Sequence, residues 1–322
     1  MQTSGVKPYL WALCACGFFA LMALLTHKLG QPAGPDGLPA CPWTVVAFVR
    51  SIVATVCAAG MTVLVGATFV VVRPRTMWIR SLAGSTSMMA TFYALARLQA
   101  SEVLTLTNTS PVWVAILSWP LGRDRPTAGV WAAVACAVAG VAVATRPHGD
   151  GFDPGPSAAA LFAAFFTAVA MLGLNRLKGI HPFAVVTHFS AVSALFGLAA
   201  WLAAAVFHVP IDAPGDPHWY EHAGVWSGIV GVGLTATAGQ VFLTLAFSRG
   251  VATRVSVVGL SQVVLVMAGE AALGWHALTP VVGLGTAMVL GPTAWLILHA
   301  RKPRVGPQTV AVPAAADEVK AA

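Results

Sequence analysis

The sequence predicts an all-α membrane protein with ten transmembrane helices in two inverted five-helix repeats. Its composition indicates the membrane: 57% of the 322 residues are hydrophobic and 9% are charged, whereas about a quarter of the residues in a soluble domain are charged. Ten separate apolar stretches, together with an internal similarity between the two halves of the chain, predict the number and the arrangement of the helices.

Each apolar stretch is about as long as a helix that crosses a bilayer. The stretches of the first half lie near residues 9–27, 44–68, 81–98, 103–121 and 128–145. Those of the second half lie near residues 157–175, 182–206, 224–247, 255–275 and 279–299. The first stretch follows a weakly basic leader, and no A-x-A cleavage site comes after it, so we interpret it as a span and not as a signal peptide.

The basic residues predict the orientation, because Lys and Arg beside a span stay on the cytoplasmic side. With the N-terminus inside, most of them fall in cytoplasmic loops, in particular at 73–80, 123–125, 176–178 and 249–254. Arg80 is counted here as a loop residue that precedes the third span. We therefore expect a multi-pass protein of the cell (inner) membrane with both termini in the cytoplasm. The net charge of +7 is then a topology signal and not a sign of nucleic-acid binding.

An offset of 152 residues aligns the two halves of the chain. At this offset LGRDRPT (121–127) falls over LGWHALT (273–279), and Arg97 falls on Arg249. Because each half has five spans, an odd number, the second half enters the membrane from the opposite side, and the repeats are inverted. The predicted domains are two five-helix repeats and a disordered cytoplasmic tail, at residues 1–147, 148–304 and 305–322 respectively.

The third and fourth stretches carry the most specific similarity to a known family. The runs RSLAGSTSMMATFYALARL (80–98) and SEVLTLTNTSPVWVAILSWPLG (101–122), with the Leu-Gly turns that close each half, resemble the EamA-type drug/metabolite transporter superfamily over about residues 8–300. The resemblance implies an exporter or exchanger of small metabolites. It also implies a central cavity lined mainly by the first four spans of each half, with the fifth spans packed at the periphery.

Two charged residues lie inside apolar stretches, where a charge at the helix centre costs about 2.5–3.5 kcal/mol. Arg50 in the second stretch either meets an anionic group of a substrate, as the resemblance implies, or extends its side chain to the nearby outer surface. Glu270 in the ninth stretch, at a similar depth, is a candidate for proton coupling or an outer rim residue. We expect the two to share an outer vestibule, either as an ion pair or as separate contacts for a zwitterionic substrate.

Uncharged polar residues form a second candidate set, at Tyr93, Asn108, Gln240 and Gln262. Polar groups near the middle of a membrane must face protein or water. Hydrogen bonding between helices explains each of them singly, whereas the set as a whole predicts the lining of a shared cavity. Pro111 breaks the fourth stretch, and no proline lies opposite it in the second half.

The fifth and tenth stretches have faces of small residues, which permit close helix contact either within the bundle or between the protomers of a homodimer. These residues are Ala132, Cys136, Gly140, Gly283, Gly285 and Gly291.

No motif in the chain predicts an enzyme, a cofactor or a metal centre. HWYEH at 218–222 matches the H-x-x-E-H zinc signature, but it lies in a short external loop without a third ligand nearby. The chain contains no Walker loop and no CxxC pair. The function predicted is secondary transport of a small polar metabolite by alternating access, with a coupling proton or a counter-substrate as partner. The alternative is a membrane regulatory or scaffold protein with the same fold and no transport.

The predicted topology places the loop 208–223 outside the cell. In a variant without native cysteines, Asp216→Cys should therefore react with a membrane-impermeant thiol reagent added to intact cells. Labelling of this cysteine only from the cytoplasmic side would contradict both the orientation and the inversion of the repeats.

Overall fold

The structure is a computed structural model that describes residues 6–30, 39–72, 74–95, 97, 103, 106–118, 127–145, 154–207, 218–274 and 280–299. Within these residues the regular structure is entirely helical. The helices of the first half are α1 (Lys7–Gly30), α2 (Trp43–Leu64), α3 (Arg75–Leu95), α5 (Ser110–Ser118) and α6 (Ala128–Thr145). Those of the second half are α7 (Pro154–Asn175), α8 (Pro182–Phe207), η1 (Trp219–Glu221), α9 (Ala223–Arg249), α10 (Ala252–Gly259), α11 (Ser261–Ala272) and α12 (Pro280–His299).

Six helical segments of the described chain are long and apolar enough to cross a membrane: α1, α2, α7, most of α8, α9, and α10 with α11. Their number and length confirm a multi-pass membrane protein, although the count is lower than the ten spans predicted. Helix α3 is long enough, but the serines and Arg80 within it lower its hydropathy. Helices α6 and α12 contain shorter apolar segments, and much of the fourth predicted span and the whole predicted tail lie outside the described residues.

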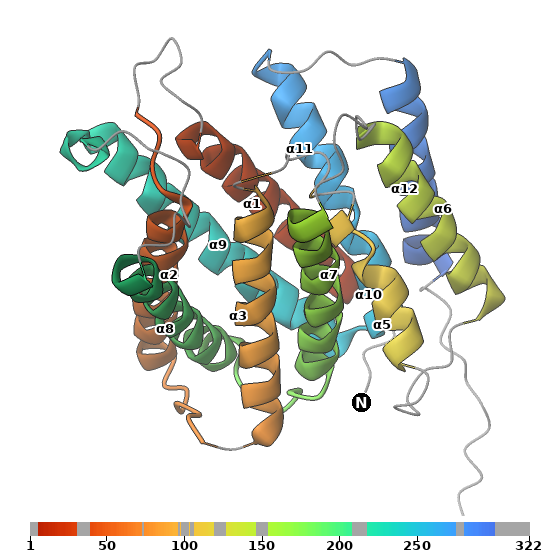
Figure 1. The fold of residues 1–322 in the computed structure, drawn as a ribbon. Coiled ribbons are helices and arrows are strands. Elements are labelled where there is room, and N and C mark those ends of the chain that lie inside the picture. Colours follow the sequence, from red (N-terminus) through yellow and green to blue (C-terminus); the bar gives the residue numbers. More distant parts are fainter. Residues whose placement is uncertain are drawn as a thin grey trace, which may run out of the picture.

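The helices pack mainly as four pairs: α1 with α9, α2 with α8, α3 with α7, and α6 with α12 (Figure 1). Small residues bring the first pair together. A Cβ atom on Gly239 of α9 would lie 2.8 Å from Phe19 of α1, and one on Gly228 would lie 2.9 Å from Leu29. The order of these contacts along the two helices shows that α1 and α9 are antiparallel.

Helices α6 and α12 form a pair at the edge of the bundle (Figure 1). The Cys136 thiol lies 3.6 Å from the Met288 carbonyl oxygen, and a Cβ on Gly140 would lie 2.8 Å from the carbonyl oxygen of Gly285. Cys136, Gly140 and Gly285 of the predicted small-residue faces therefore meet within the chain. Gly283 and Gly291, in contrast, have no neighbour within 4 Å of an added Cβ.

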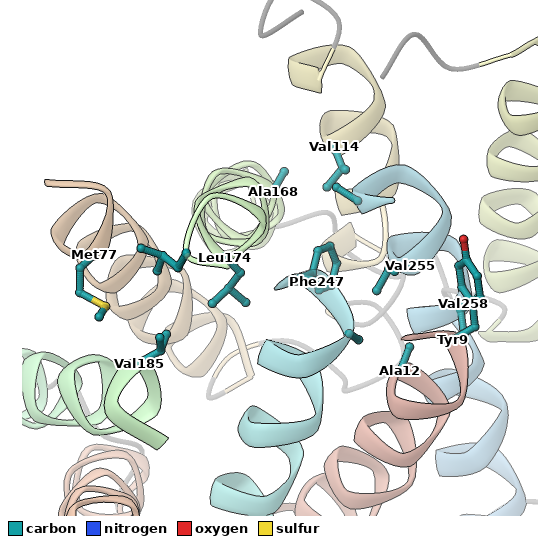
Figure 2. Packing of buried hydrophobic residues seen from close by; sticks show 13 residues of the cluster. Tyr9, Ala12, Met77, Val114, Ala168, Leu174, Val185, Phe247, Val255 and Val258 are labelled. Carbon is teal, nitrogen blue, oxygen red and sulfur yellow. The ribbon is translucent and has the colours of Figure 1, made fainter. Parts of the chain in front are cut away.

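Two apolar clusters lie at opposite ends of the bundle. The first cluster gathers the starts of α1, α3, α8 and α10 and the ends of α7 and α9 around Phe247 (Figure 2); its members include Tyr9, Met77, Leu174, Val185 and Val255. The second gathers the ends of α1 and α3 and the starts of α2 and α9, through Leu29, Val46, Phe92 and Val225. We call these the inner and the outer cluster, because the predicted topology places the first set of helix ends in the cytoplasm and the second set outside.

Candidate functional site

Helix α3 has a buried polar face along most of its length. Ser81, Ser85 and Ser87 are all buried. The hydroxyls of Ser85 and Ser193 of α8 are 2.8 Å apart, and Ser87 donates a hydrogen bond to the Ala163 carbonyl of α7. These contacts give the hydroxyls partners inside the protein, as a membrane requires. Helices α7 and α8 therefore enclose the polar face of α3.

Arg80, in the second turn of α3, is the central charge of this face. Its side chain is 2% exposed. One guanidinium nitrogen, Nη2, donates a 2.9 Å hydrogen bond to Oε1 of Gln240 on α9. The guanidinium group also lies over the ring of Phe189 of α8, 3.8 Å from its centroid. Arg80 thus connects a helix of the first half to two helices of the second half.

Two glycines make room for the Arg80 side chain. A Cβ on Gly84 would lie 2.6 Å from Nη1 of Arg80 and 2.8 Å from Phe189, and a Cβ on Gly173 of α7 would lie 3.0 Å from the Arg80 Cβ. Any larger residue at position 84 would displace the guanidinium group or the ring beneath it. The positions of both groups therefore depend on glycine here.

His188 of α8 precedes Phe189, the residue whose ring lies against the Arg80 guanidinium group. Its Nδ1 is 2.8 Å from the Ser81 hydroxyl, and the ring of Trp78 packs against it in a T-shaped contact. Its Nε2 atom is buried and has no hydrogen-bond partner in the described part of the chain. The histidine is therefore held in place by Ser81 and Trp78, and the Val71 backbone also lies near its ring.

Arg50 of α2 is the second buried arginine, at the outer cluster. Its Nη1 lies 3.6 Å from the Met22 sulfur, and its guanidinium group lies 5.6 Å from the centroid of the Phe92 ring on α3. The structure gives Arg50 no ion pair with Glu270, so that alternative in our sequence interpretation is not realised. Helix α2 packs against α8 and α9, whereas α11, which carries Glu270, packs against α1 and α12.

The remaining predicted site residues are half-buried and lie apart from Arg80. Tyr93 is near the outer end of α3, where the Arg97 guanidinium group lies 4.0 Å from its ring centroid. Asn108 is in the turn before α5, and Gln262 is at the start of α11. We call Arg80 and the residues around it, Ser81, Gly84, His188, Phe189 and Gln240, the Arg80 cluster. Of the predicted set, Gln240 is the residue that the structure places in this cluster.

The fourth and ninth predicted spans both contain a tighter turn, at positions that differ by one residue under the offset of 152. Thr109 and Val112 donate backbone hydrogen bonds to the carbonyls three residues before them, and Leu260 and Val263 do the same in the second half. Such bonds mark a 3₁₀ turn within a helix. The second half therefore has an interruption without a proline. Its freed carbonyls, those of Val258 and Gly259, accept from the Cys16 thiol of α1 at 3.7 and 3.4 Å.

The HWYEH segment forms a single 3₁₀ turn at the surface. His218 and Glu221 are both exposed and form an ion pair of 3.0 Å. Within the described residues no group of three or more His, Cys, Asp or Glu side chains could hold a metal ion.

Arg80 and His188 were missed as candidate site residues. The third apolar stretch was placed at residue 81, so Arg80 was counted among the loop charges, whereas α3 begins at Arg75. The run of Ser, Gly and Thr that follows Arg80 was the available signal, because small polar residues mark a helix face that other helices cover.

The buried polar face of α3 and the apolar clusters at both ends define a helical membrane protein with a polar layer between its two halves. Residues 6–146 match the model of the EamA-like transporter family. The match covers the first half of the chain and agrees with the resemblance of its third and fourth spans to the EamA-type drug/metabolite transporter superfamily.

Proteins of similar sequence are named as exporters or transporters, which agrees with this family. The chain is 27% identical, over 199 residues, to the pseudopaline exporter CntI of Pseudomonas aeruginosa strains UCBPP-PA14 and PAO1; the alignment covers 61% of this chain and 64% of each exporter. It is 21% identical over 212 residues to an uncharacterized transporter of Helicobacter pylori, covering 66% of this chain and 69% of that one. One crystal structure has a TM-score of 0.74 at 18% identity and covers 92% of this chain and 98% of that chain, which shows the shared fold.

The hydrogen bond from Arg80 to Gln240 predicts unequal effects for two similar substitutions. Gln240→Leu should lower the free energy of unfolding by about 1–3 kcal/mol, because it removes the acceptor of a buried cation. Gln262→Leu is the matched control, since the Gln262 side chain forms no hydrogen bond to the described residues. Thermal unfolding of the purified variants in detergent measures both. Equal effects of the two substitutions would show that the Arg80 bond contributes nothing to stability.

Proposed function

We propose that the protein is a secondary transporter that moves a small polar metabolite across the inner membrane by alternating access. We also propose that residues 1–147 and 148–304 are inverted repeats, that the chain crosses the membrane ten times, and that both termini are cytoplasmic. Transporters of this kind move two structurally related halves around a site between them.

The helix packing supports the repeat. If α1, α2, α3, α5 and α6 are exchanged with α7, α8, α9, α10–α11 and α12, the main contacts are preserved. The α1–α9 pair becomes α7–α3, the α1–α11 contact becomes α7–α5, and α2–α9 becomes α8–α3; all of these contacts exist. The exchange turns α2 into α8 and α6 into α12, so the α2–α8 and α6–α12 pairs stay the same. This pattern is expected of a pseudo-two-fold axis.

The relative directions of the helices support the inversion. Helices α3 and α8 are parallel, because Ser81 contacts His188 and Ser85 contacts Ser193 farther along both helices. Helices α1 and α9 are antiparallel, as described above. Ten alternating crossings require these directions, since α3 and α8 would be the third and seventh spans and α1 and α9 the first and eighth.

Arg80 is the observation that carries the proposal of transport. A scaffold gains little from a cation buried between two halves of a membrane bundle, since burying a charge costs several kcal/mol. A transporter needs polar groups between its halves to meet the substrate. The inner and outer clusters lie on either side of the polar layer, and we propose that they open in turn.

The other predicted substrate contacts stay part of the proposal. Arg50 is enclosed near the outer cluster, and Asn108 and Gln262 lie beside the two tightened turns, where transporters of this type bind substrates and ions. Tyr93 and Glu270 complete the set, with Glu270 as the candidate for proton coupling or, alternatively, a counter-substrate supplying the driving force. Because the related Pseudomonas proteins are named exporters, we propose that transport is outward.

Counterflow in proteoliposomes tests this function. Vesicles containing the purified protein and loaded with one unlabelled metabolite at a time should accumulate the same metabolite in labelled form, with saturation, for at least one member of a metabolite library. Gln240→Leu should reduce this exchange at least about tenfold, because Arg80 would lose the group that orients it. An exposed control, Trp226→Leu, should retain it.

Failure of counterflow for the whole library, with protein that is folded and correctly inserted, would contradict transport and favour the scaffold function. Linear uptake without saturation would contradict alternating access.

A further inference from the structure

The protein has buried hydrogen-bonding atoms that its own fold does not use. Within the described residues, the buried side-chain nitrogen and oxygen atoms without a partner are Nε of Arg50, Nε of Arg80 and Nε2 of His188. Such atoms are rare in folded proteins, because each one loses its hydrogen bond to water. Two of the three lie together in the Arg80 cluster.

We propose that the Arg80 cluster is an oxyanion site, and that the transported metabolite is an organic anion whose carboxylate or phosphate group binds Arg80 and His188. The proposal rests on the transport function above and names the class of substrate.

The contacts of Arg80 leave its Nε without a hydrogen-bond partner among the described residues. The Phe189 ring covers a face of the group, and Gln240 accepts from Nη2 alone. The donors that remain include Nε, and a planar guanidinium group binds carboxylate or phosphate through two donors side by side. Phe189 and Gln240 thus fix the direction of the guanidinium plane, and Nε, beside the second hydrogen of Nη2, is the donor that remains for a ligand.

Among the described residues, no carboxylate lies against the charge of Arg80. Gln240 is neutral, and the acidic residues of the described chain are Glu221 and Glu270, on η1 and α11, which do not pack against α3. A buried cation without a carboxylate carries a desolvation cost of several kcal/mol, which an anionic ligand relieves. The site therefore favours a negative group over a neutral or positive one.

His188 adds a second donor beside the guanidinium group. Nδ1 of His188 lies 2.8 Å from the Ser81 hydroxyl. In the tautomer in which this hydroxyl donates to Nδ1, Nε2 carries the hydrogen and can donate to an anion. Trp78 holds the ring edge-on, so this donor also has a fixed direction.

Arg50 has the same design at the other end of α3. It too lies over a phenylalanine ring, that of Phe92, and has an unused Nε. Phe92 follows Arg80 by twelve residues of the same helix, or about 18 Å. An anion that leaves Arg80 therefore meets a second arginine, Arg50, on its way to the outer cluster.

Ligand-induced stabilisation of the full-length protein in detergent tests the site. The probes are succinate, its neutral analogue succinamide and inorganic phosphate, each compared with sodium chloride at equal ionic strength. Succinate, phosphate or both should raise the Tm by about 2 °C or more at a concentration well above the Kd, and succinamide should not. A shift with succinate alone identifies a carboxylate site, and a shift with phosphate alone a phosphate site.

Variants assign the effect to Arg80. Arg80→Gln should abolish the anion-dependent shift, and Arg80→Lys should reduce it, because lysine keeps the charge and loses the fork. Arg249→Gln is the matched control, since Arg249 also lies over an aromatic ring, that of Trp11, but is exposed; it should retain the full shift.

The inference is overturned if neither anion stabilises the wild-type protein beyond sodium chloride, or if Arg80→Gln retains the shift. If Arg80→Gln does not fold, the comparison of each anion with sodium chloride on the wild-type protein still tests the inference. Counterflow of a neutral or cationic metabolite without any anion shift would refute the oxyanion site and leave the transporter. An Arg80-dependent shift without counterflow of any metabolite would leave the site and refute transport.

Discussion

The polarity of α3 is the constraint on which the arrangement of the bundle depends. This helix carries Arg80 and three buried serines, and lipid offers no hydrogen bonds to such groups. The helix must therefore be enclosed by protein. Helix α7 covers it along most of its length, α8 supplies His188, Phe189 and Ser193, and α9 contributes Gln240. All of these partners belong to the second half of the chain. The contacts that the polar groups of α3 require therefore hold the two halves together.

The same constraint separates polar and apolar regions along the membrane normal. The helix ends meet in apolar clusters, around Phe247 at one end and around Phe92 at the other, and the hydroxyls of α3 lie between them. The inner cluster is also held by a polar contact, because the Asn175 amide donates to the carbonyls of Phe247 and Gly250. This amide ties the end of α7 to the turn between α9 and α10. Opening this end of the bundle would require these two bonds to break or to move together.

The helices could be predicted from the sequence far better than the site. Long apolar runs are local signals, and the helix of the second half that was expected at 224–247 is found at Ala223–Arg249. Arg80 could not be assigned, because a basic residue at the end of an apolar run has the same appearance whether it lies in a loop or in the first turns of a helix. Of the two alternatives for Arg50 and Glu270, the ion pair is not formed, because equal depth in the membrane does not specify which helices lie next to each other. Separate contacts with a substrate stay a prediction. The tightened turn near Leu260 contains no proline, and Gly259 alone is too weak a signal to predict its backbone geometry.

Access of water to the polar face of α3 tests the central claim most directly. In a background without native cysteines, Ser85→Cys on the buried face and Leu82→Cys on the exposed face of the same helix can be compared. A membrane-impermeant thiol reagent should modify Ser85→Cys while the protein is cycling, and the transported metabolite should slow this reaction. Leu82→Cys, facing lipid, should not react. Modification of Leu82→Cys with no reaction at Ser85→Cys would contradict a substrate path along α3.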